Sequence, residues 1–151
     1  MLKLRVISAL VMAPLVIYGV LFLGNPVLSS ILAAILLAAA WEWSNLIPLR
    51  TIVTRLIYVC VLGALMWLLW WSGLETSIKP LLLAAFVWWL CALLWLSQPG
   101  LLAQASLLNS GLKMLAGTLV IVPAWAALSS LHASGERGPT LTLMLLMLVW
   151  L

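Results

Sequence analysis

Long apolar blocks alternate with short polar breaks along the whole chain, and this pattern predicts membrane-spanning helices. A span needs about 20 apolar residues, within a range of about 17–25. Five blocks fall in that range: 6–23, 27–43, 55–71, 80–96 and 114–131. A sixth block, 140–151, would reach only about 18 Å at about 1.5 Å per residue, short of a hydrocarbon core of about 30 Å. We therefore expect an all-α transmembrane helix bundle of five complete spans plus a truncated sixth.

Composition excludes the other broad classes of protein. Hydrophobic residues make up 67% of the 151 residues, and the charged residues are seven Lys or Arg and three Glu, with no Asp. Soluble domains average about 45–50% apolar and about 25% charged residues. So few charges cannot cover the surface of a water-soluble globule, and so apolar a chain is not intrinsically disordered.

The distribution of positive charge predicts the orientation in the membrane. The net charge is +4, but the basic residues are scattered between apolar blocks, which argues against a nucleic-acid partner. Basic residues favour the cytoplasmic side. A cytoplasmic N-terminus leaves only Lys79 and Arg137 outside and puts the other basic residues inside: Lys3, Arg5, Arg50, Arg55 and Lys113. We therefore predict a multi-pass membrane protein with its N-terminus in the cytoplasm.

Glu42, between Trp41 and Trp43 at the inner end of the second block, is the most informative candidate residue. A carboxylate near membrane depth costs free energy unless it is hydrated, protonated or paired, so it often marks a functional site. The structural alternative is an interfacial side chain paired with Arg50 or Arg55, and we favour it over a substrate role. Our hypothesis is that Glu42 orders the basic inner loop.

Three basic residues, Arg50, Arg55 and Lys113, are the candidates for contact with lipid headgroups. Positive charge near the cytoplasmic surface attracts anionic headgroups by about 1 kcal/mol per residue. The alternative is plain positive-inside topology, which needs no ligand and is the simpler explanation for each residue alone. With Glu42, these residues form the set of headgroup or structural candidates.

Two further features predict packing rather than chemistry. Ser30, Ala34 and Ala38 repeat every four residues, and small residues at that spacing let another helix approach closely. We expect this face to pack inside the bundle. His132 lies alone in a short outer loop, where we expect a solvated side chain.

No catalytic, cofactor-binding or metal-binding residue can be assigned from motifs. The sequence has no Walker loop, GxSxG, HExxH or GxGxxG pattern, and its three glutamates are dispersed over different loops. Cys60 and Cys91 lie inside apolar blocks without metal-ligand spacing, so we expect free structural thiols.

Four stretches of the chain together resemble the N-terminal portion of the bacterial phosphatidate cytidylyltransferase (CDP-diacylglycerol synthase) family. They are MLKLRVISAL (1–10) followed by Pro14, AAWEW (39–43) with Leu46, IVPAW (121–125) and MLVW (147–150). Each motif is short, but their order and spacing extend the resemblance over essentially all 151 residues.

The resemblance implies a multi-pass enzyme of the bacterial inner membrane that acts in phospholipid synthesis. It would condense CTP with phosphatidate, giving CDP-diacylglycerol and pyrophosphate, with Mg²⁺ as cofactor. In that family the final Val-Trp leads into an Asp-containing segment that opens the catalytic half, whereas this chain contains no Asp. We therefore expect residues 1–151 to be the N-terminal transmembrane portion of a larger enzyme, inactive alone. The sequence leaves open whether the protein is a homo-oligomer.

Two other functions stay open on the sequence. A small proton-coupled transporter would use Glu42 as its carrier group, although no inverted repeat of broken helices is present. A non-catalytic membrane scaffold is permitted by the lack of acidic clusters.

Overall fold

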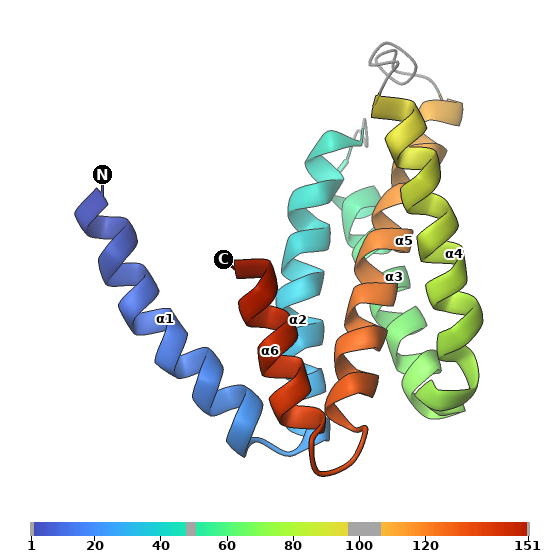
Figure 1. Cartoon of the computed structure of the whole chain (residues 1–151). Helices are drawn as coiled ribbons and strands as arrows, with labels where there is room; N and C mark the ends of the chain where they lie inside the picture. The colour runs from blue at the N-terminus through green and yellow to red at the C-terminus, as the bar shows by residue number, and fades with distance from the viewer. Residues whose placement is uncertain (1, 48–50, 97–106, 151) are drawn as a thin grey trace. The chain divides into compact units, whose positions relative to one another are not determined.

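The computed structural model describes residues 2–47, 51–96 and 107–150, and every regular element within them is a helix. The elements, drawn in Figure 1, are α1 (Leu2–Phe22), α2 (Asn25–Trp43), the short 3-10 helix η1 (Ser44–Leu46), α3 (Ile52–Ser72), α4 (Leu74–Leu96), α5 (Leu107–His132) and α6 (Gly138–Trp150). The expected all-helical fold is confirmed, with one α-helix for each apolar block.

Helix ends differ from the apolar blocks where polar residues extend a helix. The largest differences are at two helix starts: α5 begins at Leu107 rather than Met114. α4 begins at Leu74 rather than Pro80 and continues through that proline. A proline inside a helix removes one backbone donor, so this extension lacks one hydrogen bond. Gly73 separates α3 from α4 with φ of 82°, a conformation that glycine adopts without steric penalty.

Three helical stretches of the described chain are long and apolar enough to cross a membrane. They are Asn25–Leu46, Ile52–Ser72 and Leu108–His132. Shorter apolar helical stretches are Leu10–Phe22, Ile78–Leu94 and Gly138–Val149. Membrane-spanning character is therefore supported by length and composition, whereas the count of five complete spans stays a prediction.

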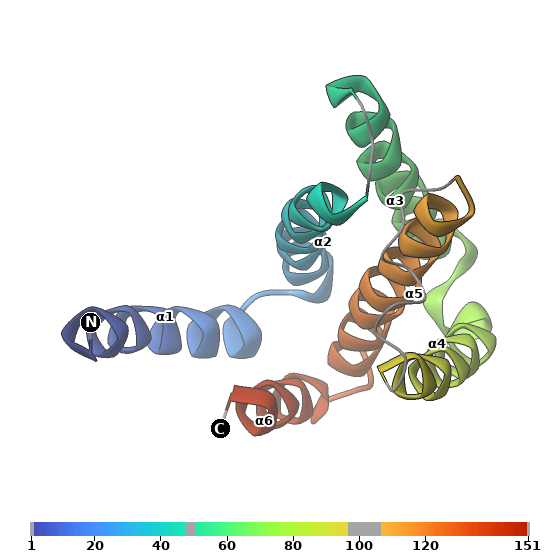
Figure 2. The same ribbon diagram turned by 90° about the horizontal axis from the view of Figure 1, so that it is seen from above.

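The chain divides into two compact units, whose boundary falls within α2 and α5. Unit 1 comprises Met1–Ile31 and Leu128–Leu151, and unit 2 comprises Leu32–Ala127. In unit 1, α1 packs against α6. In unit 2, α3 packs against α4, and Figure 2 shows α5 lying between α2 and α4.

The core of unit 2 is built from the inner faces of α2, α3 and α5. Its buried members are Ala40, Ile47, Tyr58, Leu62, Met66, Ile121, Val122, Trp125 and Ala126. The ring centroids of Trp70 and Trp125 lie 6.4 Å apart, within the usual range for aromatic pairs. Burial of these side chains fixes which side of each helix faces inward.

The small-residue face of the second block does not pack inside the bundle, so that prediction is wrong. Ser30, Ala34 and Ala38 are all exposed. In unit 2, the side of α2 that packs against the core instead carries Leu36 and Ala40. The inner face therefore combines leucines with the fully buried Ala40, whereas Ile35 is exposed, so the size of the side chain does not mark this face.

Candidate functional site

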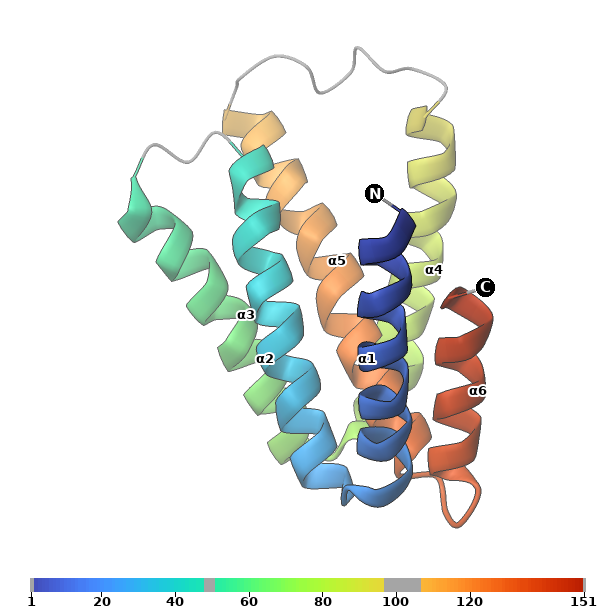
Figure 3. The same cartoon turned by 90° about the vertical axis from the view of Figure 1, so that its left-hand side faces the viewer.

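One end of unit 2 brings together three of the four candidate residues. At this end α2 and η1 finish and α3 and α5 begin, as Figure 3 shows. We call it the polar end of unit 2 and define it by Trp41, Glu42, Ser44, Arg55 and Lys113. The fourth candidate, at position 50, lies outside the described residues.

Arg55, in the first turn of α3, is held against the end of α2 by two hydrogen bonds and a ring. Its Nε donates to Ser44 Oγ at 2.7 Å, and its Nη2 donates to the Trp41 carbonyl at 3.1 Å. The guanidinium carbon lies 4.1 Å from the centroid of the Trp41 ring, a favourable cation–π distance. Because the guanidinium is planar and its donors point in fixed directions, these contacts determine where its other N–H groups point.

Ser44 is itself fixed, which makes the arrangement around Arg55 rigid. Its side chain is buried, and its hydroxyl donates to the Trp41 carbonyl at 2.6 Å. A buried hydroxyl that both donates and accepts has one orientation. Ser44 therefore orients Arg55 and does not only fill space.

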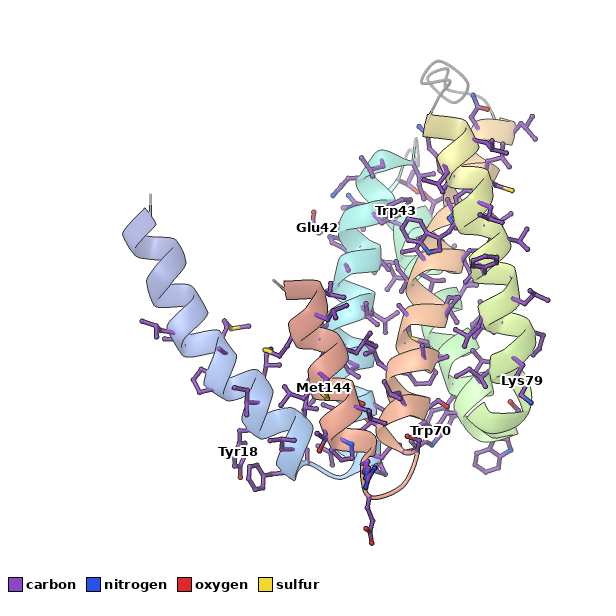
Figure 4. All side chains as sticks on the ribbon, in the orientation of Figure 1. Tyr18, Glu42, Trp43, Trp70, Lys79 and Met144 are labelled. Carbon is purple, nitrogen blue, oxygen red and sulfur yellow. The ribbon has the colours of Figure 1, made fainter. Side chains whose placement is uncertain are left out.

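Glu42 takes no part in holding Arg55. It is exposed, and its Oε2 accepts a hydrogen bond from Asn45 Nδ2 at 3.2 Å. Figure 4 shows Glu42 and Trp43 pointing to different sides of α2. The expected pairing of Glu42 with Arg55 is therefore not formed, and its role in ordering the inner loop stays a hypothesis.

Two aromatic side chains tie α2 and α3 to the backbone of α5 at this end. Trp43 Nε1 donates to the Lys113 carbonyl at 3.0 Å, and the Tyr58 hydroxyl donates to the Met114 carbonyl at 3.2 Å. A Cβ atom at Gly117 would lie 2.5 Å from each of the two donor atoms. The close approach of both rings to α5 therefore requires glycine at this position.

Tyr58 and Gly117 were not predicted from the sequence, and Lys113 was predicted at the site for a different reason. In the structure, the backbone carbonyl of Lys113 accepts the hydrogen bond from Trp43, whereas the prediction concerned the ammonium group of Lys113. No local pattern marks these contacts, because the partners are 70 and 56 residues apart in the chain. Only the folded unit brings them together.

The polar end is suited to an anionic group rather than to a divalent cation. Among the described residues there is no group of three His, Cys, Asp or Glu side chains that could hold a metal ion. Mg²⁺ prefers carboxylate and phosphate oxygens. Its expected site is therefore not provided by the described part of this chain, whose cations Arg55 and Lys113 favour an anion.

A second polar cluster, in unit 1, corrects the prediction for His132. This side chain is 5% exposed rather than solvated, and its Nε2 lies 3.0 Å from the Val20 carbonyl oxygen. Asn25 Nδ2 donates to the Ser129 carbonyl at 2.8 Å and lies 3.3 Å from His132 Nδ1. A carbonyl oxygen only accepts, so Nε2 is the donor and Nδ1 accepts from Asn25. The cluster satisfies polar groups at the ends of three helices, which is a structural role.

Comparison with known proteins relates this chain to one protein family. Residues 3–151 match the model of the cytidylyltransferase family. A phosphatidate cytidylyltransferase of Pseudomonas aeruginosa is 31% identical over 151 residues, which cover 99% of this chain and 54% of that protein. The chain thus spans about half the length of this relative. No solved structure matches this chain significantly.

Proposed function

Because the chain belongs to the cytidylyltransferase family, we propose that it forms the membrane part of an enzyme that makes CDP-diacylglycerol from CTP and phosphatidate. The single observation that carries the proposal is the similarity over 99% of the chain to a phosphatidate cytidylyltransferase. The apolar helices support it, because phosphatidate is a membrane lipid and an enzyme that uses it must reach the bilayer.

In the proposed reaction an oxygen of the phosphatidate phosphate attacks the α-phosphorus of CTP. The bond from that phosphorus to the oxygen bridging the α- and β-phosphates breaks, and pyrophosphate leaves. Mg²⁺, as the proposed cofactor, would neutralise charge on the phosphates. The described residues do not fit a Mg²⁺ site, so we propose that its ligands belong to the part of the enzyme that this chain does not span.

The contribution proposed for this chain is electrostatic and positional. The polar end of unit 2 presents Arg55 and Lys113, and we propose that it faces the cytoplasm of a bacterium, where CTP is available. Positive charge at that depth concentrates anionic headgroups beside the nucleotide. Transport by Glu42 has no support, because its carboxylate is exposed at a helix end beside Asn45.

The proposal is tested by joining residues 1–151 to the C-terminal part of the Pseudomonas aeruginosa relative that the chain does not match. Membranes containing the chimera are supplied with radiolabelled CTP and phosphatidate, and lipid-soluble label is counted. We expect CDP-diacylglycerol from the chimera and none from residues 1–151 alone. Fluorescence-detected gel filtration in detergent reports whether each protein is folded. A folded, monodisperse chimera without activity would contradict the proposal, and activity from residues 1–151 alone would contradict the division of labour.

A further inference from the structure

Arg55 is a fixed cation whose charge is not neutralised by a carboxylate in the described part of the chain. Its partners there are the neutral hydroxyl of Ser44 and the carbonyl and ring of Trp41. The one described acidic residue at this end, Glu42, is exposed and bonds to Asn45. An arginine that is positioned this firmly but left with its charge is suited to bind an external anion.

The guanidinium also retains hydrogen-bonding capacity on one edge. An arginine side chain carries five N–H donors, and the described contacts occupy Nε and one N–H of Nη2. The remaining N–H groups lie on Nη1 and Nη2, so two parallel donors are left for one ligand. A phosphate group, with several acceptor oxygens, matches such a pair in a bidentate contact.

The location of Arg55 narrows the ligand to a group found at the membrane surface or in the adjoining water. It lies in the first turn of α3, at an end of the apolar stretch Ile52–Ser72. The N-terminus of a helix carries partial positive charge, which adds to the field of the guanidinium. An anion at this depth is a lipid headgroup or a soluble phosphate compound.

We propose that Arg55, positioned by Ser44 and Trp41, binds a terminal phosphate group at the polar end of unit 2. This inference deepens the proposed function and rests on it for the identity of the two sources, the phosphatidate headgroup and the triphosphate of CTP. Both end in a phosphate with three unesterified oxygens. Trp41 and Ser44 are positioning residues, because they act on the ligand only through the guanidinium.

The experiment measures binding to the purified 151-residue chain in detergent, without any requirement for catalysis. A fluorescent phosphatidate analogue is titrated by anisotropy, with phosphatidylcholine of the same acyl chains as the zwitterionic comparison. CTP and inorganic phosphate are added as competitors. The variants are Arg55→Gln, Arg55→Lys and Ser44→Ala, and the matched control is Lys79→Gln, which removes one exposed cation at the opposite end of unit 2 (Figure 4).

We expect Arg55→Gln to weaken phosphatidate binding by about tenfold or more, because charge-assisted hydrogen bonds are lost. The affinity of Arg55→Lys should lie between those of the original chain and of Arg55→Gln, since an ammonium keeps the charge but loses the planar pair of donors. Ser44→Ala keeps the charge and loosens its orientation, so it should weaken binding by about threefold. Lys79→Gln should bind like the original chain. If CTP competes with phosphatidate and the competition depends on Arg55, the site belongs to the nucleotide. If CTP does not compete, the site belongs to the lipid.

The inference is overturned if Arg55→Gln binds phosphatidate and CTP as the original chain does, or if Lys79→Gln weakens binding equally. Should Arg55→Gln fail to fold, the Ser44→Ala result decides, and unchanged binding then refutes the positioning. The chimera separates this outcome from failure of the proposed function. An active chimera whose Michaelis constants are unchanged by Arg55→Gln refutes only the inference, whereas an inactive chimera leaves Arg55-dependent binding intact.

Discussion

Substitution of Gly117 by alanine tests the packing that builds the polar end of unit 2. The new Cβ would lie 2.5 Å from Trp43 Nε1 and 2.5 Å from the Tyr58 hydroxyl oxygen. Both rings must therefore withdraw from α5. That movement breaks the hydrogen bonds to the carbonyls of Lys113 and Met114, which are 3.0 and 3.2 Å long.

The magnitude follows from opposing contributions to the free energy of unfolding. Two hydrogen bonds contribute about 0.6–1 kcal/mol each in a membrane protein, and overpacking a core costs about 1–3 kcal/mol. Replacing a helical glycine by alanine returns about 1 kcal/mol through helix propensity. Gly117→Ala should therefore lower the free energy of unfolding by about 2 kcal/mol.

Gly111, in the same helix, provides the matched control. A Cβ atom there meets nothing within 4 Å, so Gly111→Ala should be neutral or stabilise by up to about 1 kcal/mol. Unfolding by sodium dodecyl sulfate in mixed micelles, followed by tryptophan fluorescence, measures both variants. Adding Tyr58→Phe removes one clashing oxygen, so the double variant with Gly117→Ala should lose less stability than the sum of the single changes. Equal stability of the two alanine variants would refute the packing argument.

Two further substitutions test the remaining polar contacts by the same unfolding assay. His132→Ala removes the donor to the Val20 carbonyl and the acceptor for Asn25. Because buried polar groups lose their partners, we expect the free energy of unfolding to fall by about 1–3 kcal/mol. A change below about 0.5 kcal/mol, which is typical of surface positions, would show that the cluster is not structural. Glu42→Gln changes an exposed side chain and keeps an acceptor oxygen for Asn45. We therefore expect the free energy of unfolding to change by no more than about 0.5 kcal/mol. A larger loss would mean that the charge itself orders the turn.

The sequence predicted the helices well because length and apolarity are sufficient to identify a membrane helix. Each apolar block became one helix, and Glu42, Arg55 and Lys113 came together at one end because antiparallel helices of similar length align their ends. The positive charge at those ends could also be predicted from the sequence. The extension of α4 ahead of Pro80 could not be predicted, because proline usually marks the first turn of a helix.

The faces and contacts of the helices were predicted poorly, because the sequence is apolar on all sides. Ser30, Ala34 and Ala38 were predicted to pack because they are small, but a uniformly apolar helix gives no periodic signal for its inner side. His132 was expected in water because it lies alone in a predicted short outer loop, whereas its partners Val20 and Asn25 are 112 and 107 residues away in the chain. Gly117 could not be identified for the same reason, since its importance depends on rings from other helices.

The function proposed for the chain requires that its helices cross a membrane with the polar end of unit 2 in the cytoplasm. Single cysteines at Asn45 and Lys79, both exposed and at opposite ends of unit 2, report this directly once Cys60 and Cys91 are replaced by serine. Labelling of intact spheroplasts with a membrane-impermeant maleimide should modify the cysteine at position 79 and spare that at position 45 until the membrane is permeabilised. The reverse pattern, or equal labelling of both positions in intact spheroplasts, would contradict the account.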